Sequence, residues 1–217
     1  MQSAVNYNST IFNLIDSQVA SIPINGCVVD FGSGLFTFAQ KFREHGRDVV
    51  CIEIDQSLAE LGKEANFKVL DSIEHLSSSI DFLYAVNVLE HIENDLDCLK
   101  LVFKSLETGG RAFIFVPAFQ FLYTEMDRRV GHFRRYNHAV LSQRLNQTGF
   151  VIERFEYFDQ IGFFATFIAK ILGSKLNLSQ NSVELFDRCL FKLNKFFPSF
   201  CRRFFGKNIW IIARKES

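Results

Sequence analysis

The sequence predicts an α/β fold in which helices cover a mostly parallel sheet. From residue 26 onward, short runs rich in β-branched and aromatic residues alternate with segments whose apolar residues recur at helical spacing. The strand-like runs are apolar at successive positions, which is typical of parallel strands buried on both faces. Because these runs alternate with helix-like segments, the order matches repeated strand–helix units in one sheet.

The expected elements follow in order along the chain. Strands are expected at 27–30, 48–54, 67–70, 80–86, 111–116, 151–158 and 208–214. Helices are expected at 10–19, 35–45, 58–64, 95–106, 137–148, 160–172 and 182–197. Leu96, Leu99 and Val102 illustrate the helical spacing, and Pro117 stops the fifth strand because it cannot donate a ladder hydrogen bond.

The later part of the chain departs from this alternation. Gly149 suits the C-cap of the helix at 137–148. After the sixth strand, we expect an apolar helical insertion at 159–206 that precedes the seventh strand. Within it, Asn181 and Glu184 resemble a capping box at the start of the second helix.

Composition and charge limit the function. The 217 residues, 48% of them hydrophobic, suit one domain spanning 1–217 that begins with a helical segment at 1–25. Lysine plus arginine equals aspartate plus glutamate at 24 each, so the net charge gives no general reason to bind nucleic acid. The five cysteines form no C-x-x-C pair and the histidines show no zinc-like spacing. We therefore predict free thiols, no metal site and a cytoplasmic location.

The turn after the first strand predicts a ligand site. Asp30 is followed by Gly32 and Gly34, which permit a tight turn and close approach of a ligand, before a helix whose first N–H groups are free. The second strand ends with Glu53, 19 residues beyond Gly34, whose carboxylate can accept hydrogen bonds from a ribose diol. Thr37 stands where a dinucleotide fingerprint needs its third glycine, which disfavours an NAD(P)-dependent oxidoreductase.

Several segments together resemble a known family. They are Val28 to Gly34, Glu53, Asp71, Asn87 to Ile92 and Leu106 to Arg111. In order and spacing they are similar to the successive motifs of class I S-adenosylmethionine-dependent methyltransferases, with the likeness strongest between 28 and 117. The resemblance implies a Rossmann-like methyltransferase fold, with a mostly parallel seven-stranded sheet whose last strand is antiparallel. Phe36 stands where the family often has a third glycine.

The resemblance also implies S-adenosylmethionine as cofactor and assigns residues to it. Its methionine portion would be held by Asp30, Gly32, Ser33 and Gly34. Its ribose and adenine would be contacted by Glu53, Ile54, Asp71 and Ser72. The pocket beside the sulfonium would be lined by Asn87 and Val88. Asp71 could instead be a helix N-cap or turn acid, and Glu90 with His91 could support the turn after the fourth strand rather than act in catalysis.

The segment 117–136 after the fifth strand is the richest in polar and aromatic residues. It contains a Gly-His-x-Arg-Arg-Tyr run that resembles a subgroup of these methyltransferases. Arginines beside a tyrosine and a histidine suit an anionic acceptor. The candidate catalytic residues are His132 and His91. The candidate acceptor-binding residues are Tyr123, Arg134, Arg135 and Tyr136. The alternative is a loop whose arginines pair with Glu125, Asp127 or Glu153.

The predicted function is transfer of a methyl group from S-adenosylmethionine to an oxygen or nitrogen of a small molecule, including an anionic or lipid-linked one. A sulfonium methyl is already activated, so positioning the acceptor supplies much of the catalysis. Two alternatives stay open: an NAD(P)-dependent oxidoreductase and a non-catalytic Rossmann-like binding domain. The insertion at 159–206 could cover the acceptor pocket, form a homodimer interface, or make a peripheral membrane contact; a monomer is equally open.

Overall fold

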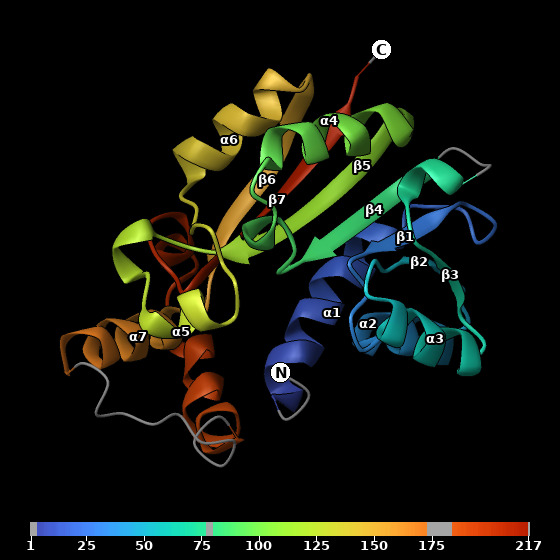
Figure 1. Ribbon diagram of the computed structural model, residues 1–217. Helices are drawn as coiled ribbons and strands as arrows, with labels where there is room; N and C mark the ends of the chain where they lie inside the picture. The colour runs from blue at the N-terminus through green and yellow to red at the C-terminus, as the bar shows by residue number, and fades with distance from the viewer. Residues whose placement is uncertain (1–3, 77–79, 173–183, 217) are drawn as a thin grey trace.

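The computed structural model describes residues 4–76, 80–172 and 184–216, and in this part of the chain seven strands form one sheet (Figure 1). The strands are β1 (Val28–Phe31), β2 (Val50–Ile52), β3 (Lys68–Leu70), β4 (Ile80–Val86), β5 (Leu106–Pro117), β6 (Phe150–Phe158) and β7 (Asn208–Lys215). Their order is β3-β2-β1-β4-β5-β7-β6, and only β7 runs antiparallel to its neighbours. The predicted fold class is confirmed.

Helices cover both faces of this sheet (Figure 1). One face is covered by α1 (Val5–Val19), α2 (Thr37–Glu44) and α3 (Gln56–Glu64). The other face is covered by α4 (Asp95–Ser105) and α6 (His138–Gln147). Neighbouring strand residues point to opposite cores: Tyr84 and Phe113 pack with α1 and α2, whereas Leu83 and Ile114 pack with α4 and α6. This alternation buries both faces, as the continuous apolar runs predict.

Polar caps fix where several helices begin and end. The Asp55 carboxylate accepts hydrogen bonds from two amides in the first turn of α3, and Asn137 caps α6 in the same way. Gly149 follows α6 with φ of 97°, the left-handed conformation that ends helices. A Cβ atom at Gly149 would lie 2.9 Å from the Phe103 ring, so its predicted role as a helix end is confirmed by both backbone and packing.

The first helix begins earlier than the sequence predicts. It was expected at 10–19, yet α1 starts at Val5. The Asp187 carboxylate accepts hydrogen bonds from the backbone amides of Asn6 at 2.9 Å and Tyr7 at 2.8 Å. These are amides that a helix N-terminus leaves without partners, and the cap lies about 180 residues away in the sequence. Local sequence therefore carries no signal for this extra turn.

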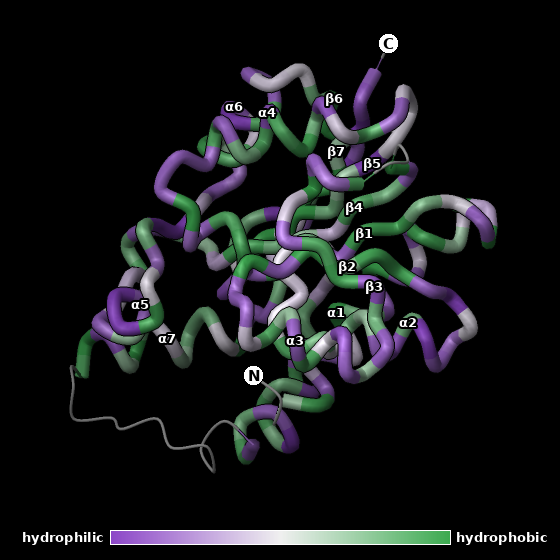
Figure 2. The backbone as a smooth tube through the Cα atoms, turned by 45° about the vertical axis from the view of Figure 1, so that its right-hand side comes forward, coloured by the Kyte–Doolittle hydropathy of each residue, from purple (hydrophilic) through white to green (hydrophobic). Residues whose placement is uncertain are grey.

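The insertion between β6 and β7 begins with the helix α7 (Gln160–Leu172). The second helix predicted at 182–197 is helical over its described residues 184–196: it is α-helical at 184–185, π-helical at Phe186–Leu190 and 3₁₀-helical at Phe191–Phe196, and a further 3₁₀ turn follows at Ser199–Arg203. Asn181 of the predicted capping box lies outside the described residues. Among the residues described, every helix falls short of the length and apolar character that a membrane span requires. Hydrophobic stretches are nevertheless plain along α7 (Figure 2).

Candidate active site

The strand order reverses between β1 and β4, and the turns that follow these two strands pack against each other. Gly32 and Gly34 after β1 have φ of 77° and 53°. A Cβ atom at Gly32 would lie 2.5 Å from a methyl group of Val88, which follows β4. Glycine is therefore required here for its left-handed backbone and for close packing, and it brings the two predicted cofactor segments together.

Glu53 closes the glycine turn from the end of β2. Its carboxylate accepts hydrogen bonds from the amide of Gly34 at 2.7 Å and from the amide of Asp55 at 2.9 Å. Glu53 is buried, whereas the next residue, Ile54, is 82% exposed. Each carboxylate oxygen keeps acceptor capacity beyond its one amide. The end of β2 thus combines a fixed carboxylate with an apolar side chain in solvent.

Asp30 is a buried acid at the end of β1. It is 3% exposed, and its Oδ2 has no hydrogen-bond partner among the described residues. Burial, with a smaller contribution from the charge of Glu53, raises the pKa of Asp30 to about 7. An unpartnered buried carboxylate oxygen is costly for the protein alone, so this position suits a bound group that donates hydrogen bonds.

The other predicted cofactor residues follow β3 and β4. The Asp71 side chain is 77% exposed and its carboxylate lies 2.7 Å from Nδ1 of His75, a contact that lowers the pKa of Asp71. Ser72 caps the short 3₁₀ turn Ile73–His75 through its hydroxyl. Asn87 has φ of 55° directly after β4, a left-handed backbone that asparagine adopts more readily than most other non-glycine residues. The cap role considered for Asp71 is therefore taken by Ser72.

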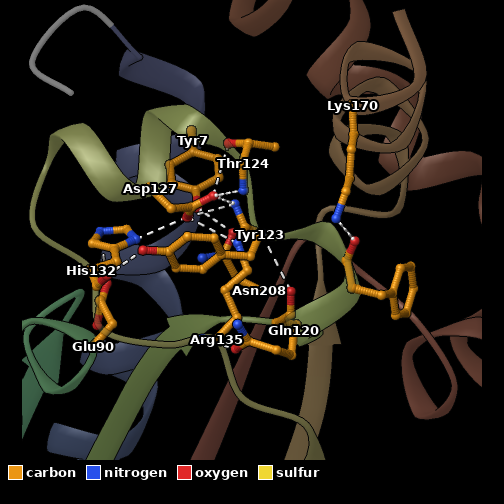
Figure 3. A network of polar contacts seen from close by, with 12 residues as sticks. Tyr7, Glu90, Gln120, Tyr123, Thr124, Asp127, His132, Arg135, Lys170 and Asn208 are labelled. Carbon is orange, nitrogen blue, oxygen red and sulfur yellow. Dashed lines mark hydrogen bonds and ion pairs between the residues drawn. The ribbon is translucent and has the colours of Figure 1, made fainter. Parts of the chain in front are cut away.

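A second group of ionisable side chains lies beside the turn after β4. His132 stands between Asp127 and Glu90 (Figure 3), with Nδ1 2.9 Å from Asp127 Oδ1 and Nε2 3.9 Å from Glu90 Oε1. The ring of His91 meets the ring of His132 edge-on at 4.6 Å. Glu90 is fully buried, and neither of its carboxylate oxygens has a hydrogen-bond partner among the described residues. Burial raises the pKa of Glu90 to about 8.

Asp127 holds this group in place. It lies in the short helix α5 (Glu125–Arg129), where it forms a capping box with Thr124. Both carboxylate oxygens of Asp127 accept hydrogen bonds from the guanidinium of Arg135 at 2.9 Å. Burial opposes ionisation of Asp127, but the hydrogen bonds from His132 and Arg135 keep its pKa well below the usual range. Asp127 is therefore an anion that orients His132 through Nδ1.

The structure places the candidate acceptor-binding residues in contact with protein groups. Arg135 is buried against Asp127, and Arg134 pairs with Asp95 at 3.0 Å. Tyr136 is fully buried, and its hydroxyl donates to Asp95 at 2.9 Å. The Tyr123 hydroxyl donates to the backbone oxygen of His132 at 2.5 Å. These four side chains therefore hold the loop in position. The pairing of Arg135 with Asp127 is one of the internal arginine pairs that the alternative interpretation predicted.

A cavity of about 440 Å³ lies away from both groups. It opens between α1, the end of β6 and the segment 191–195, and no predicted cofactor residue lines it. The strand-order reversal and the unpartnered acids, rather than this cavity, therefore define the candidate active site.

Comparison with known proteins identifies the family. Residues 6–154 match the family model described as a methyltransferase domain, which is more than half of the chain. The chain belongs to this methyltransferase family. The predicted enzyme class is thereby confirmed over the oxidoreductase alternative. A search of curated proteins found no match.

Solved structures of similar fold include several methyltransferases. One is a SAM-dependent methyltransferase from Archaeoglobus fulgidus, with TM-score 0.61, 20% identity, and coverage of 96% of this chain and 94% of that one. Another is phosphoethanolamine N-methyltransferase 2 from Haemonchus contortus, with TM-score 0.61, 14% identity and coverage of 96% and 53%. A third is magnesium protoporphyrin IX methyltransferase from Synechocystis, with TM-score 0.61, 13% identity and coverage of 98% and 84%. At these identities the likeness shows the fold.

Two parts of this methyltransferase site escaped the sequence analysis. Asp127 was named only as an ion-pair partner, yet it also orients His132, and its spacing of five residues from that histidine was the available signal. The approach of His91 to His132 had no local signal, because the two residues are 41 positions apart and meet only through the fold.

Proposed function

We propose that this methyltransferase transfers a methyl group from S-adenosylmethionine to an oxygen or nitrogen of a small-molecule acceptor. The observation that carries the proposal is the link between Gly34 and Glu53 at the strand-order reversal, beside the unpartnered Asp30. The donor is further supported by the family match, and by the Haemonchus and Synechocystis structures, which were solved with S-adenosylhomocysteine.

The residues present fit this donor. Asp30 offers a carboxylate oxygen without a partner to the ammonium group of the methionine portion. Glu53 has lone pairs left for the ribose hydroxyls, and the exposed Ile54 offers an apolar surface to adenine. The space beyond Gly34 is open, since a Cβ atom there would meet nothing within 4 Å. Asp71 would accept a hydrogen bond from the adenine amine.

The acceptor would bind beside His132. Once the sulfonium methyl is in place, the acceptor atom attacks the methyl carbon, the carbon–sulfur bond breaks, and Nε2 of His132 takes up the acceptor proton. Asp127 holds Nδ1 of the same ring and stabilises the imidazolium that forms. A positioned base of this kind contributes about 10²–10⁴-fold to a transfer to a hydroxyl. Transfer to an amine or a carboxylate depends less on a general base.

Calorimetry tests the donor. We expect S-adenosylmethionine and S-adenosylhomocysteine to bind, and NAD to give no heat of binding. The matched variant is Glu53→Ala, with Glu64→Ala at the exposed end of α3 as control. Binding of NAD alone, or equal donor binding by both variants, would contradict the proposal.

We also propose that the insertion makes a peripheral contact with an anionic membrane surface. In the described parts of this insertion, 159–172 and 184–206, eleven large apolar side chains are exposed. They are Phe164, Phe167, Ile168, Ile171, Leu172, Leu185, Leu190, Leu193, Phe196, Phe200 and Phe204. Exposed basic residues lie among them, including Lys192, Lys195, Arg202 and Arg203. Aromatic side chains that enter a bilayer interface beside basic residues that meet anionic headgroups suit such a contact, which fits a lipid-linked acceptor.

Co-sedimentation with vesicles tests this contact. We expect binding to anionic vesicles at low salt and loss of at least about tenfold in partitioning when Phe200 and Phe204 are both replaced by serine. Ile24→Ser is the matched control, because Ile24 is 73% exposed and lies in the loop before β1, outside the insertion. Absence of wild-type binding, or equal loss in the control, would remove the membrane contact from the proposal.

A further inference from the structure

We propose that Glu90, His91 and His132 bind a divalent transition-metal ion such as Zn²⁺. One ligand atom from each of these residues lies within 4.8 Å of the other two. Two imidazoles with one carboxylate form a ligand set that zinc and related ions use in catalytic sites, where three protein ligands leave a coordination position open. The sequence predicts no such site, because its ligands come from two distant segments.

The strongest reason is the state of Glu90. Its side chain is 1% exposed, and both carboxylate oxygens lack a hydrogen-bond partner among the described residues. A buried carboxyl group whose oxygens lack partners is unfavourable whether neutral or ionised, so such groups are normally hydrogen-bonded, paired or bound to a metal. The nearest ionisable atom of His132, Nε2, is 3.9 Å away, which is too far for a hydrogen bond. A cation between these two residues would give the carboxylate the partner that it lacks.

His132 is prepared as a ligand by the residues behind it. Its Nδ1 is bonded to Asp127, which leaves Nε2 directed toward Glu90 (Figure 3). Metal-binding histidines commonly place their second ring nitrogen against a carboxylate in this way, which fixes the tautomer and the ring orientation. Asp127 is itself held by Arg135 and Thr124, so the ring has little freedom to turn away.

The three ligand atoms lie within 4.8 Å of one another, so a bound ion would draw them closer together. With ligand bonds of about 2.0–2.1 Å, two ligands of a tetrahedral ion stand about 3.4 Å apart. The 3.9 Å between His132 Nε2 and Glu90 Oε1 is therefore about half an ångström too wide, a gap that small side-chain rotations close.

The position of the ion would limit which acceptors can bind. This step depends on the methyl transfer proposed above. Glu90 and His91 follow Val88, which packs on the glycine turn of the donor site. The open coordination position would take an oxygen of the acceptor, and a bound ion lowers the pKa of such a group. His132 would then be a ligand, and the ion would activate the acceptor in place of the imidazole. An acceptor that presents a hydroxyl oxygen to the ion suits this arrangement.

Zinc titration of the chelator-treated full chain tests the site. We expect about one Zn²⁺ per chain by calorimetry, and about 10–100-fold weaker binding by Asp127→Asn, which removes a charge behind His132. Glu90→Gln, His91→Ala and His132→Ala should weaken binding by at least as much. His45→Gln is the control, because His45 is exposed and lies at the end of α2. Glu90→Gln replaces a buried carboxyl group without hydrogen-bond partners by a neutral amide of similar size, so without metal it should fold as stably as the wild type.

Co²⁺ is the second probe. We expect visible ligand-field bands without the intense near-ultraviolet band that cysteine thiolates produce, which excludes binding at the five cysteines. No zinc binding by the wild type, equal binding by the Glu90, His91 and control variants, or a thiolate band would overturn the proposal. Donor calorimetry on the same metal-free protein separates the two hypotheses, because zinc can bind when S-adenosylmethionine does not, and the reverse.

Discussion

The donor end and the acceptor end of this methyltransferase site are held by different interactions. At the donor end, Glu53 accepts hydrogen bonds from the amides of Gly34 and Asp55, so the shape is set by backbone within two adjacent strand–helix units. At the acceptor end, side chains hold one another: Asp127 bonds both Arg135 and His132. Backbone turns depend on short sequence patterns, whereas side-chain networks depend on the whole fold. The two ends should therefore respond separately to substitution.

The largest expected effect is on turnover, at the acceptor end. His132→Ala should lower turnover about 10²–10⁴-fold, because it removes the positioned base or metal ligand, and should leave S-adenosylmethionine affinity unchanged. Turnover assays and donor calorimetry on the same preparation measure both. Equal losses of turnover and affinity would show that the two ends are not separate.

Next in size is an effect on stability at the donor end. The pKa of Asp30 is about 7 in the folded protein against 3.8 ordinarily, so the folded state binds the proton more tightly. Wild-type stability without donor should therefore fall as pH rises from about 4 through about 7, by up to about 4 kcal/mol. Asp30→Asn removes this loss, so it should exceed wild-type stability at about pH 8.5 and differ less at about pH 5.5. Denaturant titrations at both pH values measure this, and a pH-independent difference would contradict it.

A smaller effect is expected on donor affinity. Glu53→Ala removes a charged acceptor of ribose hydroxyls and frees the Gly34 amide, so S-adenosylmethionine should bind about 10–150-fold more weakly, at about 1.5–3 kcal/mol. Zinc affinity should not change in this variant, because the metal ligands lie at the other end. If zinc affinity fell as much as donor affinity in this variant, the donor end and the acceptor end would not be independent.

The smallest effect is expected at Asp71. Its carboxylate is 77% exposed and already contacts His75, so Asp71→Asn should weaken donor binding by a few-fold at most, about 1 kcal/mol or less. Calorimetry of S-adenosylmethionine binding to Asp71→Asn and to Glu53→Ala compares the contributions of the two acids to donor affinity. If Asp71→Asn lowered donor affinity as much as Glu53→Ala, the adenine amine would contribute as much to binding as the ribose hydroxyls, contrary to this prediction.

This contrast also explains what the sequence could predict. The strands, Gly32, Gly34 and Glu53 follow from local patterns, because apolar periodicity and glycine turns act over a few residues. The start of α1 could not be predicted, since its cap, Asp187, lies about 180 residues away. The approach of His91 to His132 is likewise a product of the fold.

The second helix of the insertion is present where the structure describes it, but its type could not be predicted from the sequence. Apolar spacing predicts a helix but does not separate α from π or 3₁₀ turns, and Phe186–Leu190 and Phe191–Phe196 adopt the latter two. The roles of Arg135 and Tyr136 were equally undecided by pattern. An arginine can meet a ligand or an internal acid, and only the burial of Asp127 and Asp95 shows which partner each side chain has.

Asp187 joins the beginning of the chain to the insertion near its end. Because one carboxylate holds the first turn of α1, the apolar surface of the insertion cannot shift far without loosening a helix whose Ile11 and Ile15 are fully buried. A displacement of the insertion would thus reach the core that α1 forms with β1 and β4, the two strands that carry the turns of the donor site. Asp187 therefore couples the exposed insertion to a helix that packs in the core.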